Sequence, residues 1–129
     1  MARVNSYRDL LVWQRAMDIA AGVYDLTRAF PREEQFGLTS QARRASVSIA
    51  AHIAEGFGRQ SRASYANFIR IAQGSLKELE THLLLAERVG VAPPGSTTAL
   101  LGNADELGRM LRALLTKLTP NSKPLSPPQ

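Results

Sequence analysis

The chain has 129 residues, of which 44% are hydrophobic and 21% are charged, and it contains no cysteine. This length accommodates one hydrophobic core and is too short for two, and the composition excludes an intrinsically disordered chain or an integral membrane protein. Without cysteine, the chain has no disulfides, thiolate zinc sites or cysteine nucleophiles. No apolar run approaches the length of a membrane span, and the first residues are too polar for a signal peptide. We therefore expect a water-soluble, cytoplasmic protein with no membrane partner.

The first predicted element is a helix from about Tyr7 to Arg28. Its apolar residues recur three and four positions apart, which places them on one face of a helix. This predicted core face consists of Leu10, Trp13, Met17, Ala20, Tyr24 and Thr27. Phe30 and Pro31 end the helix, because proline lacks the amide hydrogen that would continue it and disfavours a helical residue before it.

The second predicted helix begins near Gly37 and ends at Gly56 and Gly58, with Thr39 or Ser40 as its N-cap. Its predicted core face consists of Leu38, Ala42, Ala45, Ile49, Ile53 and Phe57. Alanine and serine are frequent on this face, and small side chains let a neighbouring helix approach closely. We therefore expect this helix to be central in the fold.

Two longer amphipathic segments follow. The third predicted helix is capped by Ser61 or Ser64 and ends at Arg88. Its apolar face consists of Tyr65, Phe68, Ala72, Leu76, Leu79, Leu83 and Ala86. The fourth predicted helix is capped by Ser96 and ends before Pro120. Its apolar face consists of Leu100, Ala104, Leu107, Leu111, Leu114 and Leu118.

Long helices joined by short connections favour antiparallel neighbours, and no segment shows the alternation typical of a strand. The sequence therefore predicts an all-α fold, an up-and-down antiparallel four-helix bundle over residues 1–119. Residues 120–129 hold four of the seven prolines and are predicted to be a disordered tail. Apolar residues outside the main stripes indicate either a wide core or an oligomer interface, and they are Val12, Ile19, Leu26, Ile71 and Leu85.

The net charge of +5 is concentrated in one part of the sequence. Residues 38–77 contain six cationic side chains and one carboxylate, Glu55, whereas the rest of the chain is neutral overall. Such a concentration favours an anionic partner, because phosphates are attracted to it and release counterions on binding. The candidate nucleic-acid-binding residues are Arg43, Arg44, Arg59, Arg62, Arg70 and Lys77. Each of them can instead make a structural ion pair, and at most one of Arg43 and Arg44 can point fully away from the core.

The sequence predicts no catalytic residues, no metal site and no cofactor. A carboxylate-bridged di-metal centre in a helical bundle needs glutamates from two helices and a Glu-x-x-His motif from each of the other two. The pairs His52 with Glu55 and Glu78 with His82 do not supply this set. Arg59 and Arg62 flank the predicted start of the third helix, where the free amides and the helix dipole favour an anion.

Several short motifs, in order along residues 7–90, resemble the four-helix-bundle proteins of the 23S ribosomal RNA intervening-sequence family. They are Asp9-Leu10, Val12-Trp13-Gln14, Phe30-Pro31, Glu34, Gly37-Leu38, Gln41, Arg44-Ala45, Ser48-Ile49, Ile53-Ala54-Glu55-Gly56, Ala72, Gly74-Ser75 and Glu78. His52 stands where the family pattern has asparagine. Proteins of this family are encoded in insertions within bacterial 23S ribosomal RNA genes and at other loci.

The family is related to the accessory variability determinant of diversity-generating retroelements, a basic pentameric barrel that partners a reverse transcriptase and nucleic acid. The resemblance therefore implies a homopentamer, and it implies association with RNA, DNA or a ribonucleoprotein. A reverse transcriptase or another protein is a further implied partner.

Two functions agree with the sequence. The first is a non-enzymatic, homo-oligomeric binding module in which the six cations contact nucleic-acid phosphates with little sequence preference. The alternative is a protein-interaction or assembly scaffold, in which the arginines make ion pairs between subunits and the additional apolar residues are buried there.

Overall fold

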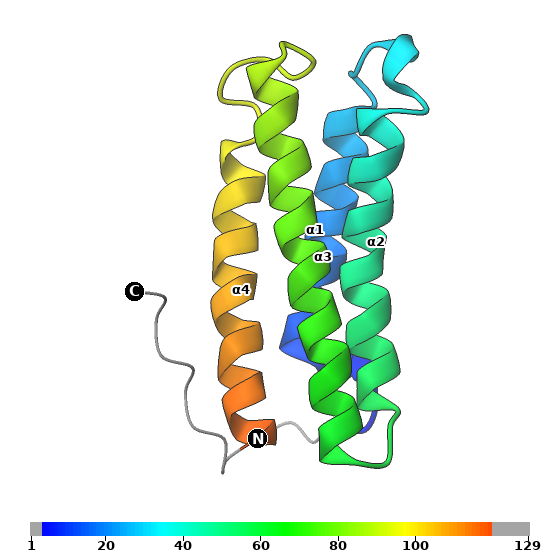
Figure 1. Ribbon diagram of the computed structural model, residues 1–129, viewed down its shortest axis with the longest axis vertical. Coiled ribbons are helices and arrows are strands. Elements are labelled where there is room, and N and C mark those ends of the chain that lie inside the picture. Colours follow the sequence, from blue (N-terminus) through cyan, green and yellow to red (C-terminus); the bar gives the residue numbers. More distant parts are fainter. Residues whose placement is uncertain (1–3, 120–129) are drawn as a thin grey trace.

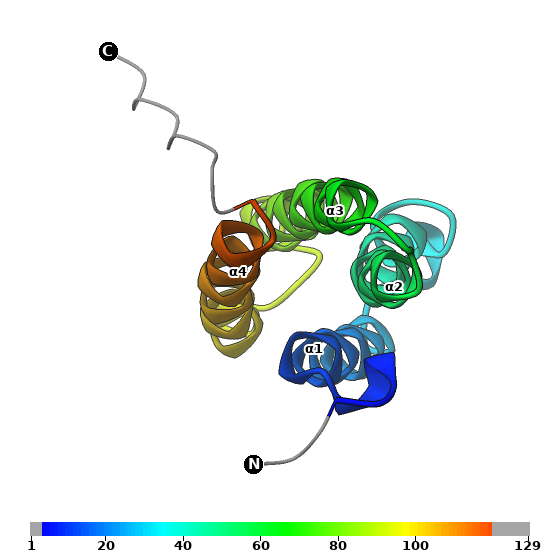
Figure 2. The ribbon, with the colours of Figure 1, turned by 90° about the horizontal axis from the view of Figure 1, so that it is seen from below.

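Residues 4–119 are described in the computed structural model, and they form four helices: α1 (Leu11–Thr27), α2 (Leu38–Phe57), α3 (Arg62–Arg88) and α4 (Thr98–Leu118). Consecutive helices run in opposite directions (Figure 1). Seen along the axis, they occupy the corners of a square in chain order, and α4 closes the ring against α1 (Figure 2). This arrangement confirms the predicted all-α, up-and-down four-helix bundle. The predicted tail at 120–129 lies outside the described residues.

No helix in the described part of the chain combines the length and the apolar character that crossing a membrane requires.

The first helix starts later than predicted. Residues Tyr7–Asp9 form a separate 3₁₀ turn, and Leu10 is extended before α1 begins. Ser6 organises this turn with Asp9: the Ser6 hydroxyl accepts the amide hydrogen of Arg8, and the Asp9 carboxylate accepts the amide hydrogen of Ser6. This reciprocal capping stabilises a short turn in place of the first turn of a continuous helix.

The predicted caps are correct for α3 and wrong for α2. The Ser61 hydroxyl accepts the amide hydrogen of Ser64 at 3.1 Å, as expected. At the start of α2, however, Thr39 is buried within the helix, and the carboxylate of Glu34 accepts the Leu38 amide hydrogen at 3.1 Å. Glu34 is the last residue of the 3₁₀ turn Arg32–Glu34, and this turn places its side chain at the start of α2. At the start of α4, the Ser96 hydroxyl donates to the Pro93 carbonyl and does not cap the helix.

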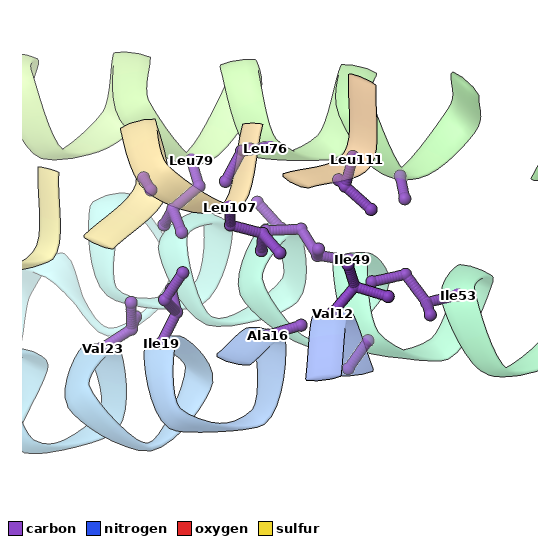
Figure 3. Close-up of a cluster of buried hydrophobic side chains, with 14 of the residues drawn as sticks. Val12, Ala16, Ile19, Val23, Ile49, Ile53, Leu76, Leu79, Leu107 and Leu111 are labelled. Carbon is purple, nitrogen blue, oxygen red and sulfur yellow. The ribbon is translucent and has the colours of Figure 1, made fainter. Parts of the chain in front are cut away.

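The core lies along the bundle axis and receives side chains from all four helices (Figure 3). For α2, α3 and α4, the predicted apolar faces supply its centre, with Ile49, Leu79 and Leu107 almost completely buried. For α1 the predicted face is correct in part: Ala20 and Thr27 are buried, and Leu10 and Trp13 pack against the core. Met17 and Tyr24 remain 45% and 38% exposed. A second apolar stripe of α1 faces the centre of the core, and it consists of Val12, Ala16, Ile19 and Val23.

The most extensive contact between helices is that of α2 with α3. Alanine and glycine on the facing sides make it close. A Cβ atom at Gly56 would lie 2.8 Å from the Phe68 Cβ and 3.0 Å from the Tyr65 ring, so only glycine fits. Burial at this contact raises the pKa of the Tyr65 phenol above its ordinary value.

The predicted central position of the second helix is wrong. α2 contacts α1 and α3, so it is a corner of the square like the other helices.

Two glycine substitutions should change stability in opposite directions. Gly56→Ala should lower the free energy of unfolding by about 1–3 kcal/mol, because the added methyl group must displace backbone or side-chain atoms of α3. Gly102→Ala in α4 should raise it by about 0.5–1 kcal/mol, because alanine favours helix and a Cβ there meets nothing within 4 Å. Urea unfolding of both variants measures these changes, and a neutral Gly56→Ala would contradict the close packing of α2 and α3.

Candidate nucleic-acid interface

The six candidate cations do not form one cluster. Arg43 and Arg44 border a groove between α1 and α2, whereas Lys77 borders a groove between α3 and α4 on the opposite side of the bundle. Arg59 lies in the turn after α2, and Arg62 is the first residue of α3. The structure therefore distributes the cations over several faces of the protomer.

Arg43 is engaged within the bundle. Its Nε atom donates to the Thr27 hydroxyl at 2.8 Å, and its guanidinium carbon lies 4.5 Å from the centre of the Tyr24 ring. The half-buried side chain thus joins α2 to α1 through a hydrogen bond and a cation–π contact. Arg44 is exposed and makes no ion pair among the described residues. Of the two neighbours, Arg44 is the one that points away from the core.

Arg59 stands beside an aromatic side chain at the end of α2. Its guanidinium carbon lies 4.6 Å from the centre of the Phe68 ring, and Phe68 in turn stacks on His52. Arg59 and Arg62 are both exposed, and within residues 4–119 neither has a carboxylate partner. Both guanidinium groups therefore remain available to an anion near the start of α3.

The groove between α3 and α4 contains cations that the sequence analysis did not single out. It has a volume of about 510 Å³ and is lined by Gln73, Gly74, Leu76, Lys77, Asp105, Gly108, Arg109 and Arg112. Lys77 pairs with Glu80 at 3.0 Å and Arg109 pairs with Asp105 at 3.2 Å. Arg112 has no ion pair in the described part of the chain.

Net charge along the sequence does not indicate Arg109 and Arg112. Outside residues 38–77 the charges cancel in number, and in α4 the carboxylates Asp105 and Glu106 offset the arginines. The missed signal is positional: Arg112 is three residues from Arg109, so the two are neighbours on the helix, and no carboxylate stands three or four positions from Arg112. Glu106 points elsewhere and pairs with Arg15 of α1 at 3.5 Å.

His52 takes part in a polar network between α2 and α3. Its Nδ1 atom lies 2.7 Å from the Ser48 carbonyl oxygen and 3.0 Å from the Ser48 hydroxyl, which lies 2.9 Å from the Ser75 hydroxyl. The contact with the carbonyl oxygen is a hydrogen bond when Nδ1 carries the proton, because a carbonyl oxygen only accepts. Among the described residues no group of three or more His, Asp or Glu side chains is placed to hold a metal ion.

Replacing Arg43 separates packing from binding. Arg43→Met should lower the free energy of unfolding by about 1–2 kcal/mol, because it removes a hydrogen bond and a cation–π contact. Arg44→Met is the matched control and should stay within about 0.5 kcal/mol of the unsubstituted protein. Urea unfolding of Arg43→Met, Tyr24→Leu and the double variant should give less than additive losses. Unchanged stability together with weaker nucleic-acid binding would instead make Arg43 a binding residue.

Comparison with known proteins gives one family and one fold. A family model described as 23S rRNA-intervening sequence protein matches residues 8–113. A crystal structure of a protein of unknown function from the S23 ribosomal protein family of Bacteroides thetaiotaomicron is similar, with a TM-score of 0.73 and 23% sequence identity. The similarity covers 81% of this chain and 98% of that one, and it supports the same bundle fold. No match is found among curated proteins.

Proposed function

The chain belongs to the 23S rRNA-intervening sequence protein family, and on this premise we propose that it is a non-enzymatic, homo-oligomeric module that binds the backbone of RNA or DNA. The observation that carries the proposal is the set of exposed arginines that have no ion pair among the described residues. They are Arg8, Arg32, Arg44, Arg59, Arg62, Arg70, Arg88 and Arg112, and we propose Arg44, Arg59, Arg62, Arg70 and Arg112 among them as the phosphate contacts. An unpaired surface guanidinium matches a phosphate in geometry and charge.

Oligomerisation multiplies the modest positive charge of one protomer. One protomer carries +5, and an oligomer repeats each arginine at regular positions around a symmetry axis. We infer the number five from the family relationship to a pentameric barrel. A reverse transcriptase or a ribonucleoprotein is the partner that this relationship suggests.

Two different exposed apolar surfaces support an oligomer. On the α1–α2 side, Met17, Tyr24 and Val47 are exposed, and a groove of about 380 Å³ lies beside Tyr24 and Val47. On α3, Ile71 and Leu85 are exposed and share a face, because they are fourteen positions apart, close to four helical turns. Two unlike surfaces suit a head-to-tail contact, which closes into a ring when the rotation between subunits allows it.

The assembly can be tested by damaging one surface at a time. Met17→Glu and Ile71→Glu should each convert the oligomer to monomers, because each buries a carboxylate in an apolar contact. An equimolar mixture of the two variants should form dimers, since each variant keeps the surface that the other lacks. Light scattering after size-exclusion chromatography measures these masses, and a monomeric unsubstituted protein at high concentration would contradict the proposal.

Nucleic-acid binding can be tested by fluorescence anisotropy with a structured ribosomal RNA fragment and a duplex DNA. Binding should weaken steeply between about 50 and 200 mM salt and depend little on base sequence, because phosphate contacts release counterions. The variant Arg59→Gln, Arg62→Gln, Arg70→Gln should bind more weakly to both probes. Absence of binding at low salt would refute this function and favour the alternative, a protein-interaction scaffold whose arginines pair between subunits.

A further inference from the structure

We propose that the groove between α3 and α4 is a binding site for the phosphodiester backbone of nucleic acid, with Arg70, Arg109 and Arg112 as its phosphate contacts. This inference rests on the proposed function and names the site within it. It also adds α4 to the binding surface, whereas the sequence placed every candidate on α2, α3 and the turn between them.

The walls of the groove are cationic on both sides. On α4, Arg109 and Arg112 are three positions apart and both line the groove. On α3, Arg70, Gly74 and Lys77 follow one another at intervals of four and three positions, which places them along one side of the helix. A concave surface with one predominant sign of charge concentrates its field and attracts counter-ions.

The carboxylates near the groove offset two of its three lining cations and leave the third without an ion pair. Asp105 is paired with Arg109 and Glu80 with Lys77, so each carboxylate is already engaged with one cation. Arg70 and Arg112 are both exposed and have no ion pair within the described residues. The uncompensated positive charge of the lining therefore lies at Arg112, and Arg70 adds a second unpaired cation about one helical turn before Gly74 on the same side of α3.

The two glycines of the groove leave room for a ligand. A Cβ atom at Gly74 would meet nothing within 4 Å, and one at Gly108 would meet only the Leu76 side chain at 3.6 Å. Packing within the protomer therefore does not require glycine at either position, although glycine inside a helix costs about 0.5–1 kcal/mol relative to alanine. A phosphate backbone that enters the groove makes use of this space, since it can approach the helix without a side chain between them.

The lining favours phosphates over bases. Among residues 4–119 no aromatic side chain lines the groove, so these residues offer no surface there on which bases can stack. Guanidinium groups bind the oxygens of a phosphodiester through paired hydrogen bonds, and these contacts are the same for every base sequence. RNA and DNA share this chemistry, and both should bind.

The test compares two double variants with the same loss of charge. Arg109→Gln with Arg112→Gln removes two groove cations, and Arg28→Gln with Arg32→Gln removes two exposed cations outside the groove, in the connection between α1 and α2. Anisotropy titrations use labelled RNA and DNA strands of one sequence at several salt concentrations. The groove variant should bind roughly tenfold or more weakly, and its salt slope should fall by about 2, because two phosphate contacts are lost. The control should keep the slope of the unsubstituted protein.

Two substitutions at Gly74 provide a second test that leaves every arginine in place. Gly74→Asp should weaken binding, because it places a carboxylate in open space within the groove. Gly74→Ala should raise the thermal unfolding temperature, which shows that the position tolerates a side chain.

The two probes distinguish what the groove recognises. An equal loss of affinity for RNA and DNA supports a site for phosphate alone, and a larger loss of affinity for RNA supports a site that also contacts the ribose.

Failure of this inference is distinct from failure of the proposed function. If the unsubstituted protein binds and both double variants bind equally well or equally poorly, the groove is not the site. If the groove variant changes the oligomer mass in light scattering and not the affinity, the groove is a subunit contact. If the unsubstituted protein does not bind either probe, the proposed function itself is refuted.

Discussion

The close contact between α2 and α3 is the constraint on which the arrangement of the bundle depends. At Gly56 the two helices are too near for even a methyl group, and no other pair of helices is in more extensive contact within the described chain. This approach fixes which side of α3 faces α2 and therefore which side faces α4. The side toward α4 is where Gly74 and Lys77 meet Gly108, Arg109 and Arg112. The candidate groove is thus a consequence of how tightly the helices pack on the other side of α3.

The sequence predicts the number and direction of the helices well, because spacing and helix-ending residues are local properties. The sequence does not predict which face of a helix is buried when two of its faces are equally apolar. Helix α1 carries two apolar stripes, and only packing against the other three helices selects Val12, Ile19 and Val23 over Met17 and Tyr24. The predicted cap of α2 is wrong for a similar reason. The Glu34 carboxylate reaches the Leu38 amide through the 3₁₀ turn between α1 and α2, and the sequence pattern does not indicate that turn.

The candidate site is less predictable than the fold because the role of a charge depends on its neighbours in space. Arg43 counts as one cation in the sequence, yet in the structure it lies over Tyr24 and donates to Thr27. Arg112 does not stand out in the sequence, because outside residues 38–77 acidic and basic residues are equal in number. In the structure, however, it has no ion pair among the described residues. A count of charges indicates that an anion can bind, and only the fold indicates where.

The central claim, that nucleic-acid phosphates lie between α3 and α4, can be observed directly with glycine-selective ¹⁵N labelling. The nine glycines give nine backbone amide signals, a number that can be resolved and assigned by single substitutions even in a large assembly. Addition of an oligonucleotide should shift the signals of Gly74 and Gly108 and leave those of Gly22 and Gly37 unchanged. Shifts confined to glycines outside the groove would contradict the account.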